Sequence, residues 1–345
     1  MNTQNSILVA LLVLLLSGSG HAATVTLKIA TAAPEASSWV KAMRESAAEI
    51  KQRTEGRVVI KYYVGGIQGS DAQVLKKMRI RNLHGAAFTP SALNDIYPDI
   101  NLYGLPLTFN DYEEARYVRD RMDQALIDGL AEEGYVTFGF ASTGFAMVMS
   151  NDPVRGVDDL RGKKVWVPEG DPVSYRSMEA LSVSPTALPL TDVMVGLQTE
   201  LLDIVPVSPI GALFLQWYTR VSYVTDMPLV YTFGFMVVDK KMYERIDAAD
   251  QAIVGEVMKR AYAEFDAIGK SDNESALQAI LDKGLQRVEV TAAEMQRIRA
   301  TMAKANRELA NQGIVSIEMY ETMLKHRNEY RNGQASAPEQ LAASE

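Results

Sequence analysis

The chain has 345 residues, of which 47% are hydrophobic and 23% are charged, and its net charge is -8. This negative charge disfavours a role in binding nucleic acid or an anionic membrane surface. The length suffices for two domains with substantial cores, so a small molecule or a protein is the expected partner.

The N-terminal residues 1–23 have the features of a secretory signal peptide. The apolar run 7–16 is too short to span a bilayer, and small residues after it suit cleavage near Ala22 or Ala23. The first six residues carry no lysine or arginine, which departs from the usual pattern. Because the chain has no cysteine, it can have neither disulfides nor a lipid-modified cysteine. We expect an exported protein that lies free in the periplasm.

The first part of the mature chain alternates between strand and helix patterns. Strands are predicted at 25–29, 57–64, 83–88 and 135–142, and helices over about 39–55, 71–80 and 111–133. The loop 65–70, GGIQGS, has neither the spacing of GxGxxG nor a GK[ST] ending, so it matches no phosphate-binding loop. We interpret it as a turn before a helix, with Ser70 and Gln73 as a capping box.

The segment 160–209 contains two further β-α units and a third apolar run. Asp171 is placed to cap the first helix, with Pro172 at its first position, and Thr191 is placed to cap the second. Strands are predicted at 165–167, 186–188 and 204–207. In a mostly parallel sheet, ligands bind outside the carboxyl ends of the strands. The site is therefore expected near Trp166, Pro168, Leu188 and residues 206–208.

The last part of the chain predicts a strand at 233–239 followed by a very long helix. The helix opens at Asp247 and Asp250 and reaches about residue 283, a length on the order of 50 Å. The alternative is two helices broken near residues 269–273. A strand at 286–290 and a helix capped by Thr291 and Glu294 follow. The small, polar tail 331–345 is predicted to be disordered.

Residues for most enzyme chemistries are missing. Beyond the signal peptide only His84 and His326 are histidines, and the sequence contains neither HExxH nor GxSxG. We therefore predict that the chain is not an enzyme and that it uses no metal or cofactor.

Five segments, in the same order and spacing, resemble the solute-binding proteins of tripartite ATP-independent periplasmic (TRAP) transporters of the dicarboxylate-binding (DctP) type. They are 27–66, LPLTFNDYEEAR at 105–116, SNDPVRGVDDLRGKKVWVPE at 150–169, SPTALPLTDVMVGLQTELLD at 184–203, and the SP at 208–209. The resemblance extends from residue 24 to about residue 328.

This resemblance implies an α/β, two-lobed periplasmic binding protein fold (type II-like). It has mostly parallel sheets, hinge strands, and a long helix that spans both lobes. We assign 24–140 and about 232–270 to lobe I, and 141–231 and about 271–330 to lobe II. The resemblance also implies that a monomer captures a ligand by closing its lobes and delivers it to membrane permease subunits.

Three substitutions depart from the family pattern. The family usually binds organic acids through an arginine at the position of Trp166, and a second arginine aligns with Ala146. Ser208 replaces an asparagine. A guanidinium grips a carboxylate with two charge-assisted hydrogen bonds, whereas an indole offers one neutral donor and a large apolar face. We therefore predict a small, substantially apolar ligand.

Two alternatives stay open at this point: an organic acid held by Arg176 or Arg155, and a secreted sensor or interaction module on the same fold. Trp166 itself has an alternative role as a core residue. The candidate ligand-binding residues are Trp166, Pro168, Ala146, Phe145, Ser208, Tyr175, Trp217, Phe233 and Thr89, with Met147, Phe214 and Tyr231 as weaker candidates.

Overall fold

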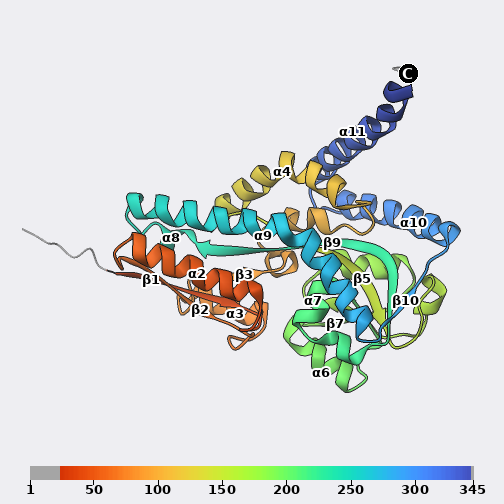
Figure 1. The fold of residues 1–345 in the computed structure, drawn as a ribbon, viewed down its shortest axis with the longest axis horizontal. Helices are drawn as coiled ribbons and strands as arrows, with labels where there is room; N and C mark the ends of the chain where they lie inside the picture. Colours follow the sequence, from red (N-terminus) through yellow and green to blue (C-terminus); the bar gives the residue numbers. More distant parts are fainter. Residues whose placement is uncertain (1–23, 343–345) are drawn as a thin grey trace, which may run out of the picture.

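The computed structural model describes the backbone of residues 24–342 and the side chains of residues 24–334. The predicted signal peptide lies outside the described residues. Ten strands form a sheet along the path β2-β1-β3-β9-β5-β8-β6-β7, with β4 and β10 also paired to β9. The halves of this sheet belong to two lobes, which Figure 1 shows at opposite ends of the long axis.

Lobe I is built on the half of the sheet that contains β1, β2, β3, β4 and the end of β9. Its strands are β1 (Val25–Thr31), β2 (Val58–Tyr63), β3 (Gly85–Phe88), β4 (Tyr135–Thr137) and β9 (Tyr223–Asp239). All run parallel except β9, which is antiparallel to β3 and β4. The helices α2 (Ser38–Arg53), α3 (Asp71–Arg79), α4 (Tyr112–Glu132) and α8 (Lys240–Tyr243) accompany this half.

Lobe II is built on the other half of the sheet and on the first half of β9. Its strands are β5 (Ala141–Ser150), β6 (Val165–Pro168), β7 (Pro185–Leu188), β8 (Ile204–Val207) and β10 (Gln286–Val288). Here β5 is the antiparallel strand. The helices α5 (Pro172–Ala180), α6 (Val193–Gln198) and α7 (Pro209–Phe214) connect these strands. The predicted mostly parallel α/β architecture is confirmed.

Successive side chains of β6 pack in different cores, one on each face of the lobe II sheet, because side chains alternate along a strand. Trp166 packs in one core with Val205 and Trp217, and Val165 and Val167 pack in the other. One strand thus places an indole on the face opposite its valines.

The strands β5 and β9 cross between the lobes. Their pairing is interrupted twice, between Ser142 and Gly144 and between Ala146 and Val148. The second interruption places Pro228 of β9 outside the regular ladder, which suits a residue without an N–H donor. Bulges bend and twist a strand, so these two interruptions mark the hinge between the lobes.

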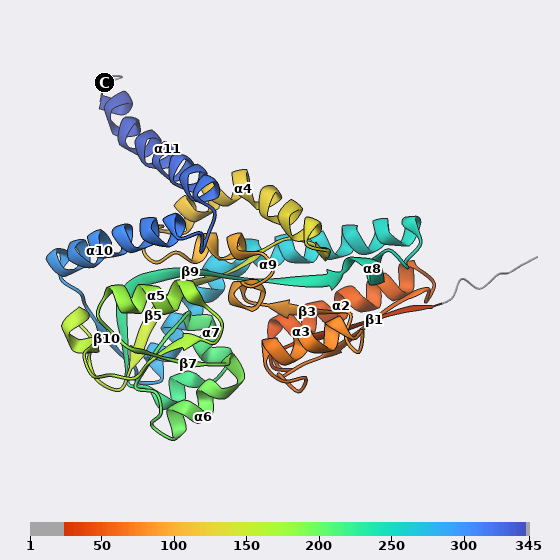
Figure 2. The same ribbon diagram turned by 180° about the vertical axis from the view of Figure 1, so that it is seen from behind.

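Helix α9 (Ala248–Asp282) is continuous over 35 residues, so the alternative of two broken helices is wrong. Phe265 packs in the lobe I core and Ile280 in a lobe II core, and Figures 1 and 2 show the helix passing along both lobes. The proposed break at 269–273 is instead where the helix meets β5. Asn273 lies against Gly144, and its Oδ1 accepts a hydrogen bond from Ile210 N at 3.3 Å.

Gly269 allows α9 to approach β5 closely. A Cβ built on Gly269 would lie 2.5 Å from the Ser142 carbonyl oxygen. Gly269→Ala is therefore expected to lower the free energy of unfolding by about 1–3 kcal/mol, because the helix must move away from the hinge strand. Gly255→Ala on the same helix is the control, since its Cβ would meet only Tyr243 Oη at 3.8 Å. That variant is expected to be stabilised by about 0.5–1 kcal/mol. Chemical denaturation measures both, and equal effects would contradict the proposed contact.

Two predictions about the chain ends differ from the structure. Helix α10 (Ala292–Asn311) begins on lobe II, but Leu309, Tyr320 and Met323 belong to the lobe I core, so the chain returns to lobe I within the segment assigned to lobe II. Helix α11 (Ile317–Ala342) packs against α4 and continues into the tail that was predicted to be disordered, as far as the described residues extend. Alanine, glutamate and glutamine in this tail are strong helix formers.

The predicted strand 135–142 was also wrong as a single element. Gly139 has a φ of +134° and separates β4 from β5, and the two phenylalanines that flank it, Phe138 and Phe140, pack in the lobe I core. Within the described residues, no helix is long and apolar enough to cross a membrane. In the same part of the chain, no group of three or more histidine, aspartate or glutamate side chains is placed to hold a metal ion.

Candidate functional site

A cavity of about 350 Å³ lies between the lobes, within the range of small-molecule sites. Lobe I contributes the residues after β1 and β3, and lobe II contributes those after β6 and β8. The carboxyl ends of these four strands thus lie at one cleft, as expected for an open α/β sheet. The hinge strands, residues 265–272 of α9, and residues of α2, α3 and α5 also line the cavity.

The lobes touch beside this cavity. A Cβ on Gly66, in the loop before α3, would lie 2.9 Å from Thr191 Cγ2 in lobe II. Gly66 has a φ of +70°, a conformation that glycine adopts without strain. The GGIQGS loop is therefore a turn, as predicted, and Gln73 Oε1 accepts a hydrogen bond from Ser70 N at 3.1 Å as in a capping box.

Aromatic side chains contribute to the cavity wall from both lobes and from the spanning helix. Trp39 stacks on Phe265 with ring centroids 4.6 Å apart, which joins α2 of lobe I to the spanning helix. Tyr231 and Phe233 of β9 stack at 6.0–6.4 Å on their neighbours along the strand. The aromatic residues that line the cavity are Trp39, Phe88, Trp166, Phe214, Tyr231, Phe233 and Phe265.

The charged residues of the wall are all acidic. None of the described residues lining the cavity is a lysine, an arginine or a histidine. The four charged lining residues are Asp71, Glu169, Asp171 and Asp272. Burial raises the pKa of the Asp71 carboxyl to about 6 and also raises the pKa of Asp171, although hydrogen bonds from Ser174 and Val173 oppose the shift at Asp171.

Trp166 is both a lining residue and a core residue. It is 5% exposed, its ring lies 5.2 Å from that of Trp217 in an edge-to-face arrangement, and it lines the cavity. Its Nε1 donates a hydrogen bond to the Leu188 carbonyl oxygen at 2.9 Å. The indole donor is thereby used within the fold, so Trp166 offers the cavity an apolar surface.

Five other predicted site residues also line the cavity: Pro168, Ala146, Ser208, Phe233 and Thr89. Ser208 Oγ accepts a hydrogen bond from Gly211 N at 3.3 Å and so caps α7. Among the weaker candidates, Phe214 and Tyr231 line the cavity, whereas Met147 packs in a lobe II core.

The prediction was wrong for three site residues, which do not line the cavity. Tyr175 is 41% exposed on the outer face of α5, and Trp217 is 1% exposed behind Trp166. Phe145 packs edge to face against Tyr112 and Tyr231 in the core. Each was chosen because it is aromatic. Aromatic character alone does not indicate which face of a helix a side chain occupies, or whether the side chain lies in a core or in a cleft.

Neither arginine of the organic-acid alternative lines the cavity. Arg176 is paired with Glu179 on the surface of α5, at 2.9 Å. Arg155 precedes the short helix η3 (Val157–Leu160), and its backbone N–H donates to Asp159.

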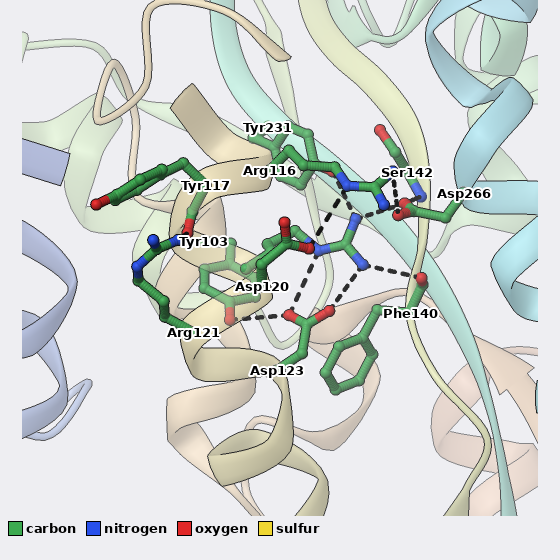
Figure 3. Close-up of polar contacts among 11 residues, drawn as sticks. Tyr103, Arg116, Tyr117, Asp120, Arg121, Asp123, Phe140, Ser142, Tyr231 and Asp266 are labelled. Atoms are coloured by element: carbon green, nitrogen blue, oxygen red, sulfur yellow. Dashed lines mark hydrogen bonds and ion pairs between the residues drawn. The ribbon is translucent and has the colours of Figure 1, made fainter. Parts of the chain in front are cut away.

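A buried arginine, Arg119, contacts the hinge strand β9 and the residue before β5, outside the cavity. Arg119 of α4 donates to Tyr231 Oη and to the Phe140 carbonyl oxygen, both at 2.9 Å, and it pairs with Asp123 and Asp266. Figure 3 shows Tyr103, Ser142 and Tyr231 gathered around this network. Asp266 Oδ1 also accepts from Ser142 N at 2.9 Å. Arg119 therefore positions Tyr231 in the wall but does not itself line the cavity.

In lobe I, sequence reasoning found Thr89 and Phe233 but missed most of the other lining residues. The residues after β1 and β3 could have been found by the rule that located Trp166 and Pro168, because they also follow parallel strands. Asp71 and Ser177 gave no comparable signal: an aspartate in the first turn of a helix and a serine within one are common.

Residues 29–312 match the family model described as bacterial extracellular solute-binding protein, family 7, DctP. A solute-binding protein of Chromohalobacter salexigens is 24% identical over 276 residues, which cover 78% of this chain and 82% of that protein. The C4-dicarboxylate-binding periplasmic protein DctP of Rhodobacter capsulatus is 24% identical over 264 residues, which cover 74% of this chain and 78% of that protein.

The fold is also found among solved structures. A TRAP periplasmic solute-binding protein of Shewanella oneidensis with bound succinate superposes with a TM-score of 0.82 and 19% identity, covering 88% of this chain and 100% of that chain. At this identity the likeness shows a shared fold.

Proposed function

Because the chain belongs to family 7 of the bacterial extracellular solute-binding proteins, DctP, we propose that it captures a small, substantially apolar solute between its lobes and delivers it to a TRAP membrane permease. Family membership confirms that the chain is a solute-binding protein rather than an enzyme. The apolar ligand, the permease and an exported, periplasmic, monomeric form are parts of the proposal.

One observation carries the choice of ligand: aromatic side chains line the cleft, and no lysine, arginine or histidine among residues 24–334 does. A carboxylate moved from water into such a wall loses its hydration without gaining a cation, which costs several kcal/mol. Arg176 and Arg155 lie away from the cavity, which weighs against the organic-acid alternative. Nothing specific in the cleft favours a sensor role.

Identifying the compound that the protein carries tests the proposal. We expect that protein purified from the periplasm and then unfolded releases a mainly apolar compound without a carboxylate, in near-equimolar amount. Mass spectrometry of the released extract measures this. A Trp166→Arg protein isolated in parallel is the control, because it should release far less of the compound. An equimolar carboxylate released from the wild type would overturn the proposal.

A further inference from the structure

Asp71 presents an uncompensated carboxyl group to the cleft. It occupies the first position of α3, and within residues 24–334 its side chain has no hydrogen-bond or ion-pair partner. Burial alone accounts for the pKa shift to about 6, and no nearby cation lowers it. A partly buried carboxylate without a partner is costly, so it is a feature that a ligand can compensate.

Two of the other acidic residues of the wall differ from Asp71. Asp171 caps α5 by accepting from Ser174 N at 3.0 Å and from Ser174 Oγ at 2.6 Å. Glu169 is exposed to solvent, whereas Asp272 of α9 is half-buried like Asp71 and also has no hydrogen-bond or ion-pair partner among the described residues. Asp171 therefore has a structural role, and Asp71 and Asp272 are the half-buried lining acids without a partner among the described residues. Asp71 is the one on lobe I, and burial desolvates its carboxyl group enough to raise its pKa.

A second polar group in the wall also lacks a partner. Ser177 of α5 is completely buried, its Oγ has no hydrogen-bond partner among the described residues, and it lines the cavity from lobe II. A helical serine commonly donates to the carbonyl four residues earlier, and Ser177 does not. Each lobe thus contributes to the cavity wall a polar side chain without a partner among the described residues.

We infer that the solute has an apolar body and a positively charged nitrogen, which Asp71 binds. This inference rests on the proposed function and specifies its ligand class. The charge of the wall is complementary to a cation, because its four charged lining residues are acidic. The aromatic lining suits the same ligand, since the faces of tryptophan, tyrosine and phenylalanine rings attract cations.

The test compares ligands that share an apolar body and end in a positively charged, a neutral or a negatively charged group. Matched sets of 2-phenylethylamine, 2-phenylethanol and 3-phenylpropanoate, with cyclohexyl and indolyl analogues, are titrated into wild type, Asp71→Asn and Asp272→Asn proteins at pH 7.5. Amines are expected to bind wild type best. Asp71→Asn should weaken amine binding at least tenfold and leave the alcohols unchanged, and Asp272→Asn should have a smaller effect on the amines.

The outcomes separate the inference from the proposed function. Alcohols that bind as well as amines, or amines unaffected by Asp71→Asn, would overturn the inference and leave an apolar ligand. Preferential binding of the carboxylates would overturn both, and so would the absence of binding throughout the sets. Asp71→Asn removes an uncompensated charge and keeps the side-chain shape, so it is expected to fold at least as stably as wild type.

Discussion

Replacing Arg119 with methionine is expected to lower the free energy of unfolding by about 3–5 kcal/mol. Breaking a buried ion pair by removing one partner has this cost because the other charge stays behind. Here two carboxylates lose a cation, since Arg119 pairs with both Asp123 and Asp266. Only Asp266 keeps another cation, Arg116 at 3.7 Å. The Phe140 carbonyl oxygen and Tyr231 Oη lose a donor as well. Urea denaturation at pH 7 measures the change.

Arg121→Met is the matched control for this prediction. Arg121 lies two residues further along α4, where it is exposed, stacks on the Tyr117 ring and donates to the Tyr117 carbonyl oxygen, as Figure 3 shows. Exposed substitutions of this kind usually change stability by less than about 0.5 kcal/mol. The account of the hinge would be contradicted if the two variants lost similar stability, or if Arg119→Met lost less than about 1 kcal/mol.

The sequence was sufficient to predict those parts of the fold that depend on local patterns. Period-two and helical stripes located most strands and helices, and the pattern of α9 predicted a spanning helix before any contact was known. Gly269 misled this reasoning, because a glycine within a helix pattern indicates either a weak point or a close contact. Only the packing of β5 against the helix distinguishes the two.

The site could be predicted only in part, because the residues that line a cleft do not recur at a regular spacing in the sequence. Tyr175 was chosen for its aromatic ring, whereas the helix turns Ser177 toward the cavity and Tyr175 toward solvent. Arg119 lies in a run of charged residues that is typical of an exposed helix face. Its burial depends on β5, β9 and α9, which are distant in sequence.

Trp166→Arg is expected to weaken binding of the released ligand by at least about 100-fold, or about 2.7 kcal/mol. The substitution replaces an apolar surface of the cleft with a guanidinium, which must be desolvated against a ligand that offers it no partner. Circular dichroism and thermal melting establish that the variant is folded. An affinity within tenfold of wild type would count against an apolar contact at this position.

Because Trp166 also packs in a core, its truncation needs a control that separates binding from stability. Trp217 provides it, since it packs against Trp166 in the same core but does not line the cavity. Both alanine variants are expected to lose several kcal/mol of stability, because each removes a large buried aromatic side chain. Only Trp166→Ala removes a side chain that contacts the ligand in our account.

The most direct test is a calorimetric titration of the released ligand into wild type, Trp166→Ala and Trp217→Ala proteins, at a temperature where all three are folded. Losing a large aromatic from a binding centre commonly costs about 2 kcal/mol or more. We expect Trp166→Ala to bind at least about tenfold more weakly than wild type, and Trp217→Ala to bind within about threefold of wild type. Equal affinities of wild type and Trp166→Ala would contradict the claim that this cleft holds its ligand by apolar contact.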